Sequence, residues 1–368
     1  MLTLNSARRA FFVVAAIGLC GVSVAGAPAP LARETEALAP ELSGLGTLHV
    51  PHLRAQHRGE GAADVQRRFE RAWTRADVTL TSSRIMTDDL SGRSVVDATA
   101  DRDGWNVTLP TGVRLNYVER GDPRGTPVVL LHGYSDSRHS YDRILPLLPS
   151  SFHVFAVTHR GHGDSGKPDT GYTPSHFAAD LAAFLDTMRI PSAVIVGHSM
   201  GSTVAQRFAI DYPSRTRAVV LEGAFFPSPH NEPIREFFKT VSAFTDPLDA
   251  TVVREFQEST LARPVPSDFF ERIVNESLKV PVRVWKAALE PYLTVDFSDR
   301  LTDVTVPTLL VWGDRDAFTG RAEQDRLNRA IARSRLTVYS GTGHCPHWEE
   351  PERFAADVAA FVRSADAP

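Results

Sequence analysis

The chain has 368 residues, of which 42% are hydrophobic and 23% are charged. This is the composition of an ordinary soluble globular protein, and the length fits one large domain with insertions. The formal net charge of −4 is not that of a strongly basic nucleic-acid-binding protein, so we expect no nucleic acid as a partner.

The first 27 residues have the features of a secretory signal. Arg8 and Arg9 precede a short apolar run, residues 11–19, and small residues follow as far as Ala27. The run is shorter than a membrane span requires. We therefore predict a cleaved signal of the twin-arginine type over residues 1–27, export to the periplasm or the extracellular space, and no stable membrane span after cleavage. An uncleaved N-terminal anchor is the alternative.

Residues 28–103 contain few features that specify structure. Prolines near the start favour an extended leader, and residues 62–73 place three apolar side chains at helical spacing. We expect a leader of uncertain structure over this range.

From residue 104 the chain alternates between apolar strand-like runs and amphipathic helix-like runs. The predicted strands are 105–109, 113–118, 128–131, 152–157 and 193–196, and the predicted helices are 141–148, 174–188 and the segment after Ser199. This alternation predicts an α/β fold with a mainly parallel sheet that helices cover on both faces.

Ser199 lies between a predicted buried strand and a predicted helix, with Gly197 and Gly201 two residues away on either side. A tight, strained turn at this point needs glycines where the backbone passes close, and it lifts the serine hydroxyl above the sheet. The helix aims its unpaired N–H groups at the same point. This arrangement is typical of a nucleophile elbow, in which the N–H of Met200 would be one oxyanion donor. A chance match of the motif in a loop is the alternative, which the strand–turn–helix context disfavours.

A serine nucleophile needs a base and an acid that orients the base, and behind such an elbow they follow in the order acid, then histidine. A buried strand runs into a loop with Asp314 and Asp316, and a later strand precedes a loop with His344 and His347. Glu222, which ends the strand after the serine's helix, is a rival acid. Its alternative role is a hydrogen bond to nearby backbone.

The pattern between residues 225 and 303 is helical, and aromatic side chains recur along it. We predict a helical insertion over 225–303 that divides the core into residues 104–224 and 304–368. Most of the aromatic side chains are expected to form the core of the insertion. Phe225 and Phe226 follow a strand end and are the first candidates for an apolar substrate pocket.

Taken together, the motifs resemble those of the α/β-hydrolase superfamily, in the branch of serine esterases, haloperoxidase-like perhydrolases and carbon–carbon bond hydrolases. The matching pieces are His132-Gly133-Tyr134, Arg160-Gly161-His162-Gly163-Asp164-Ser165, Gly197-His198-Ser199-Met200-Gly201, Gly313-Asp314-Arg315-Asp316 and Gly343-His344. The resemblance covers roughly residues 105–363 and implies the α/β-hydrolase fold, with residues 225–303 as a cap inserted late in the sheet. The sequence departs from the family pattern at His159, because relatives usually have an aspartate before the Arg-Gly-His-Gly turn.

The resemblance also implies roles for individual residues. It places the family's acid on Asp316, in preference to Glu222, and its histidine on His344. It places the second oxyanion donor on the N–H of Tyr134, beside the N–H of Met200. The alternative role of Tyr134 is that of a pocket wall alone, and we expect its side chain to line the pocket.

The first functional hypothesis is an exported serine hydrolase that cleaves a carboxylic ester or lactone with an apolar moiety through an acyl-enzyme. A carbon–carbon bond hydrolase or a perhydrolase would use the same triad. A non-catalytic binding protein on a hydrolase scaffold is the alternative from another class. We predict no cofactor and no metal site, because the sequence has neither a phosphate-cradling loop nor a defined metal-ligand spacing. The expected partner is a small-molecule ester or lactone, and no pattern in the sequence specifies an oligomeric state.

Overall fold

The structure is a computed structural model, and it describes residues 104–366. The predicted signal over residues 1–27 and the predicted leader over residues 28–103 lie outside the described residues. No helix in the described range has the length and apolar character needed to cross a membrane.

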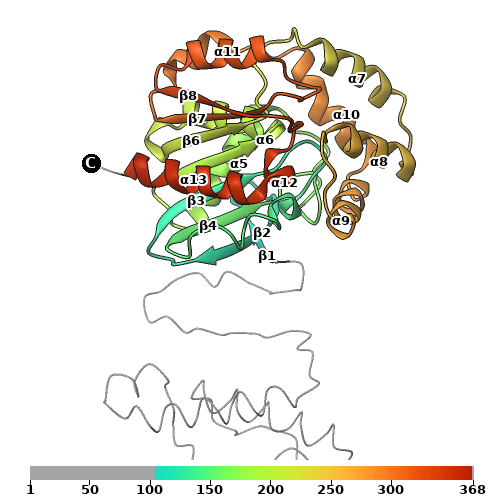
Figure 1. Ribbon diagram of the computed structural model, residues 1–368. Helices are drawn as coiled ribbons and strands as arrows, with labels where there is room; N and C mark the ends of the chain where they lie inside the picture. Colours follow the sequence, from blue (N-terminus) through green and yellow to red (C-terminus); the bar gives the residue numbers. More distant parts are fainter. Residues whose placement is uncertain (1–103, 367–368) are drawn as a thin grey trace, which may run out of the picture. The chain divides into compact units, whose positions relative to one another are not determined.

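An eight-stranded sheet forms the centre of the described residues (Figure 1). Its strands are β1 (Trp105–Thr108), β2 (Arg114–Gly121), β3 (Thr126–Leu131), β4 (Phe152–Val157), β5 (Ala193–His198), β6 (Thr216–Glu222), β7 (Thr308–Gly313) and β8 (Ser334–Tyr339). They lie in the order β1-β2-β4-β3-β5-β6-β7-β8. The pairs β1–β2 and β2–β4 are antiparallel, and every pair from β4 to β8 is parallel. The predicted mainly parallel sheet is therefore confirmed.

Helices cover both faces of this sheet, as predicted. Val129 of β3 packs in an apolar layer with α5 (Pro174–Thr187) and α6 (Met200–Asp211), whereas its neighbour Val128 packs in a second layer with α13 (Pro351–Asp366). Successive side chains of a strand point to opposite faces, so a doubly covered strand needs apolar residues at every position. This requirement explains the unbroken apolar runs in the sequence.

The helix predicted near residues 141–148 is wrong. A 3-10 turn, η1 (Arg138–Tyr141), is followed by hydrogen-bonded turns over 142–148. Pro146 and Pro149 have no N–H to donate, so an α-helical ladder cannot continue through this segment.

A helical segment joins β6 to β7, inside the range 225–303. It consists of α7 (Glu232–Ser242), α8 (Ala250–Ser259), α9 (Ser267–Leu278), α10 (Val282–Leu289) and the 3-10 turns η3 (Glu290–Leu293) and η4 (Ser298–Asp303). Asn231 caps α7 by accepting a hydrogen bond from the N–H of Ile234, and Asp249 caps α8 in the same way. The four α-helices gather at one end of the sheet (Figure 1). The chain then returns to the core through β7, α11 (Arg321–Ala330), β8, α12 (Pro346–Glu349) and α13.

Candidate active site

Ser199 occupies a strained turn between β5 and α6. Its φ of 53° and ψ of −114° lie in a region that residues with a side chain rarely adopt. A hydrogen bond of 2.9 Å from its N–H to the carbonyl of Glu222 holds this turn against β6. A Cβ on Gly197 would lie 2.2 Å from the carbonyl oxygen of Gly201, and one on Gly201 would lie 2.1 Å from that of Leu131. The spacing of the two glycines is therefore a steric requirement of the turn.

His344 and Asp316 form a buried hydrogen-bonded pair. Nδ1 of His344 lies 2.8 Å from Oδ2 of Asp316. The carboxylate also accepts hydrogen bonds from the N–H groups of Phe318 and Thr319, at 2.8 and 3.1 Å, and from the Thr319 hydroxyl at 2.5 Å. The chain segments after β7 and β8, which are parallel neighbours, thus deliver the two side chains to one point.

Electrostatics favours opposite charges on this pair. Burial acts to raise the pKa of Asp316, but the charge of His344 and the hydrogen bonds to the carboxylate hold that pKa below its ordinary value. Burial acts to lower the pKa of His344, but the negative charge of Asp316 outweighs it and raises the pKa. Asp316 is therefore an acceptor for Nδ1–H, which leaves Nε2 of His344 available to take a proton.

Ser199 and His344 line the same cavity. Among the described residues, no hydrogen bond joins the Ser199 hydroxyl to His344. Such contacts are often long in a free enzyme and tighten when substrate binds. The structure thus brings Ser199 and His344 to one cavity, with Asp316 hydrogen-bonded to His344.

The two residues predicted to supply the oxyanion donors also line this cavity. Tyr134 and Met200 line it, and within residues 104–366 neither backbone N–H has an acceptor. Met200 is the first residue of α6, where an N–H has no partner inside the helix. The Tyr134 side chain is among those that line the cavity, as expected, and its hydroxyl donates to the carbonyl of Trp285.

Glu222, the rival acid, pairs with a different histidine. Its Oε1 accepts from the N–H of His347 and lies 2.8 Å from Nδ1 of the same residue. Both side chains are fully buried, and burial raises the pKa of Glu222 to about 7. The geometry therefore pairs His344 with Asp316 and not with Glu222.

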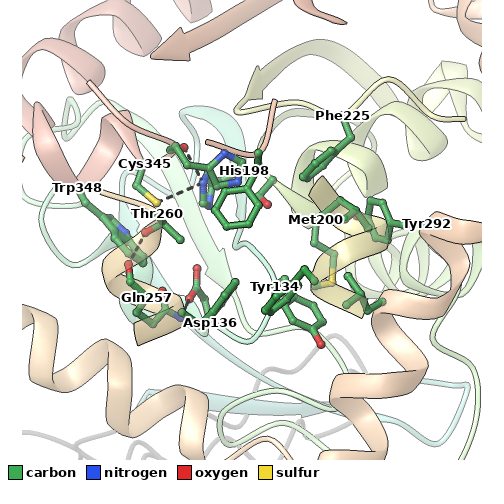
Figure 2. A pocket seen from close by; sticks show the side chains of 17 residues that line it. Tyr134, Asp136, His198, Met200, Phe225, Gln257, Thr260, Tyr292, Cys345 and Trp348 are labelled. Carbon is green, nitrogen blue, oxygen red and sulfur yellow. Dashed lines mark hydrogen bonds between the residues drawn. The ribbon is translucent and has the colours of Figure 1, made fainter. Parts of the chain in front are cut away.

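The cavity has an apolar wall and a polar wall (Figure 2). It encloses about 480 Å³ of space, open solvent at its mouth included. The apolar and aromatic lining residues are Tyr134, Met200, Phe225, Ile234, Phe237, Phe256, Leu289, Tyr292, Phe318 and Trp348. The polar wall contains Asp136, Gln257 and Thr260, and Gln257 donates to Asp136 at 3.0 Å.

Of the two residues that the sequence suggested for the pocket, Phe225 and Phe226, only one lines the cavity. Phe225 lines the cavity, with its ring 5.5 Å from that of Tyr292. Phe226 does not line it, and the expectation that it would is corrected. The guanidinium of Arg326 lies 3.7 Å over the Phe226 ring, which packs outside the cavity.

The polar wall is the part of the site that sequence reasoning missed. Asp136 lies two residues after Tyr134, in the loop that follows β3, and that proximity was the available signal. Gln257 comes from α8, and nothing in the sequence places this helix against the β3 loop.

Comparison with known proteins identifies the family of the chain. The family model described as "alpha/beta hydrolase fold" matches residues 126–351. The pimeloyl-[acyl-carrier protein] methyl ester esterase of Neisseria meningitidis serogroup A is 31% identical over 243 residues, which are 64% of this chain and 76% of the relative. The non-heme chloroperoxidase of Streptomyces lividans is 29% identical over 284 residues, or 70% of this chain and 99% of the relative.

A solved esterase from Thermogutta terrifontis has the same fold. It has a TM-score of 0.61 and 25% identity over 71% of this chain and 98% of its own. The match of the family model over more than half of the chain, together with the doubly covered sheet, shows that the chain belongs to the α/β-hydrolase family.

Proposed function

We propose that the protein is a serine hydrolase that cleaves carboxylic esters or lactones with an apolar moiety through an acyl-enzyme. The observation that carries the proposal is the convergence of strained Ser199, the His344–Asp316 pair and two N–H groups without acceptors on one aromatic-walled cavity. Esterases among the relatives of the chain support the same class of reaction.

The proposed reaction assigns one task to each group. The Ser199 hydroxyl attacks the ester carbonyl carbon, and Nε2 of His344 accepts its proton. Asp316 holds the imidazole in the required tautomer and stabilises its positive charge. The N–H groups of Met200 and Tyr134 stabilise the oxyanion, a contribution for which loss of one donor typically costs about 10²–10³ in rate. His344 then returns the proton to the leaving alcohol, and water hydrolyses the acyl-enzyme.

The test is labelling and turnover of a Ser199→Ala variant. We expect a fluorophosphonate probe to label the parent protein at Ser199 and the variant to lose both labelling and ester hydrolysis, with an unchanged melting temperature. Ser242→Ala, which removes an exposed hydroxyl on α7, is the matched control and should retain both. Normal turnover by Ser199→Ala would contradict the assignment, and a parent protein that neither labels nor hydrolyses would favour the binding-protein alternative.

Perhydrolysis is a second candidate activity, favoured by the similarity to the Streptomyces lividans chloroperoxidase. The same acyl-enzyme would be intercepted by hydrogen peroxide in place of water, giving a peracid. Peracid formation that requires both hydrogen peroxide and Ser199 would support this activity, and its absence in a protein that hydrolyses esters would exclude it.

A further inference from the structure

Four buried side chains form a continuous hydrogen-bonded chain beside the candidate active site. Nδ1 of His347 lies 2.8 Å from Oε1 of Glu222, and Nε2 of the same ring lies 3.0 Å from the Ser140 hydroxyl. That hydroxyl lies 3.4 Å from Oδ2 of Asp136, which lines the cavity. None of the four residues is more than 2% exposed. The proposed reaction uses none of them, although they connect the end of β6 with the polar wall of the cavity.

Neither Glu222 nor Asp136, the carboxyls at the two ends of this hydrogen-bonded series, suits a permanent negative charge. A buried carboxylate is costly unless all of its oxygens are paired, and Oε2 of Glu222 has no hydrogen-bond partner. Burial raises the pKa of Glu222 and that of Asp136 to about 7, although hydrogen bonds from Gln257 and Ser140 oppose the rise at Asp136. Burial therefore disfavours a negative charge on both carboxyls at once and favours one charge shared between them.

The ring between the carboxyls can transmit that charge. Burial lowers the pKa of His347 well below its ordinary value, so its ring is neutral and carries one N–H. With the proton on Asp136, the carboxyl donates to Ser140, Ser140 donates to Nε2 of His347, and Nδ1–H donates to the Glu222 carboxylate. In the opposite arrangement every one of these hydrogen bonds is reversed. Nε1 of Trp348, 3.0 Å from the Ser140 hydroxyl, can donate to it in both arrangements.

We propose that Asp136, Ser140, His347 and Glu222 form a proton relay through which two carboxyls share one negative charge and present it to His344. Moving the charge shifts one proton along each hydrogen bond, so each O–H or N–H bond that breaks is matched by one that forms, and no electron is gained or lost. The catalytic use of the relay rests on the proposed function. Asp136 and Glu222 are positioning residues in that reaction, because they act through His344 and not on the substrate.

The link to His344 is electrostatic. After Asp316, the negative charges that raise the pKa of His344 are those of Glu222 and Asp136. A charge at either end of the relay therefore stabilises the imidazolium that forms when His344 takes the proton of Ser199.

Other titratable groups face the relay from the elements around it. They are Tyr141 of η1, Arg143 after it, His198 of β5, Asp316 after β7, Tyr339 of β8, and His344 and Cys345 after β8. Burial raises the pKa of Tyr141 and Cys345 and lowers that of His198, which keeps all three neutral at neutral pH. Among these groups, His344 is the one whose pKa is raised by Asp316 and by both relay carboxyls.

The tautomer of His347 is a direct readout of the relay. Nitrogen-15 NMR of the full chain, labelled at histidine, reports it, and a His347→Gln variant identifies the resonance. Asp136→Asn should confine the charge to Glu222 and fix the Nδ1–H tautomer. Glu222→Gln should confine it to Asp136 and fix the Nε2–H tautomer, and the parent should show an average of the two. The same tautomer in both variants would overturn the relay, and this outcome does not depend on any enzymatic activity.

The pH profile of kcat/KM tests the catalytic use. Each single variant should lower the pH of the acidic limb only slightly, because the charge remains on the other carboxyl. The double variant should lower it by about one pH unit, more than the sum of the single shifts. Additive shifts, or no shift, would overturn the shared charge. Glu255→Gln is the control: this exposed carboxyl of α8 lies outside the relay and should leave the limb unmoved. If the double variant does not fold, the His347 tautomers of the two single variants decide whether the relay exists.

Discussion

At the scale of single residues, the candidate site is fixed by contacts that leave its reacting groups little freedom. The backbone of Ser199 is held in a conformation that costs about 1–3 kcal/mol. Hydrogen bonds from Phe318 and Thr319 hold the Asp316 carboxylate in place. The carboxylate in turn fixes the orientation of the His344 imidazole. Orientation of this kind lowers the barrier because it need not be achieved during the reaction.

Asp316→Asn should impair turnover far more than Glu222→Gln. An amide at position 316 can favour the wrong tautomer of His344 and cannot stabilise its positive charge, a defect worth about 10⁴ in rate in comparable triads. Removal of the Asp316 charge also removes the main cause that raises the pKa of His344, so the remaining activity should persist to lower pH. The measurement is kcat/KM against pH for both variants. If Glu222→Gln were the inactive one, the acid of the triad would be Glu222.

At the scale of elements, the core sheet carries the proposed chemistry and the helical segment between β6 and β7 shapes much of the cavity. Phe237 of α7, Phe256 of α8 and Tyr292 of η3 all line it. The rings of Phe237 and Phe256 are stacked with their centres 4.8 Å apart, which gives the wall a defined shape. Such an arrangement lets substrate selectivity change through the helices while the strands keep the triad geometry.

The apolar wall should make kcat/KM rise with acyl chain length until the cavity is full. Burial of one methylene is worth roughly 0.8 kcal/mol, which is about fourfold in kcat/KM per carbon. Phe225→Ala should move the optimum to bulkier substrates, because its ring lines the cavity. Phe226→Ala is the matched control, since that ring packs under Arg326, and it should leave the optimum in place. A flat series in the parent, or the same shift in both variants, would show that selectivity is set elsewhere.

At the scale of the whole molecule, neutral histidines are part of the packed core. His132, His159 and His162 lie together, with ring centres 4.6 Å apart for the first two and 5.2 Å for His132 and His162. The N–H of His159 donates to Nε2 of His132, at the residue where the sequence departs from the family pattern. His132 directly precedes Gly133 and Tyr134, so the cluster lies next to the loop that follows β3.

Stability should fall as the pH falls from about 6.5 to about 4. Burial lowers the pKa of His159 to about 3 and that of His162 to about 4, from an ordinary value of 6.5. Between these limits the unfolded chain binds protons that the folded chain does not, so each residue removes up to about 1.4 kcal/mol of unfolding free energy per pH unit.

His162→Asn tests this contribution, because its amide can still donate to the carbonyl of Arg160, which Nδ1 of His162 contacts at 2.8 Å. Urea unfolding of the variant should show a shallower loss of stability with acid. The same substitution at exposed His230 is the control and should follow the parent. Parallel curves for His162→Asn and the parent would contradict the assignment of this loss to His162.

A prediction about the whole chain concerns its location: we propose that the protein is exported by the twin-arginine route. Arg8 and Arg9 lie outside the described residues, and the proposal rests on their position before the short apolar run. Replacing both arginines with lysine keeps the charge and should leave the protein in the cytoplasm. Fractionation of cells expressing each form measures this, and unchanged export of the double-lysine variant would point to the general secretory route.

The sequence by itself determined the sheet, its double covering and the chemical identity of the candidate nucleophile. These features are local: unbroken apolar runs specify buried parallel strands, and Gly197 and Gly201 are needed wherever a strand turns this sharply into a helix. The order of acid and histidine along the chain followed from the same motifs. The resemblance then favoured Asp316 with His344, but nothing in the sequence paired Glu222 with His347.

Only the tertiary structure decided which of these residues meet. Asp316 reaches His344 and Glu222 reaches His347 because neighbouring parallel strands end at one edge of the sheet, and strand order is not encoded in any single segment. For the same reason the sequence did not reveal that Asp136 and Gln257, 121 residues apart, form one polar wall. Contacts between distant segments depend on how the elements pack, and packing is a property of the whole fold.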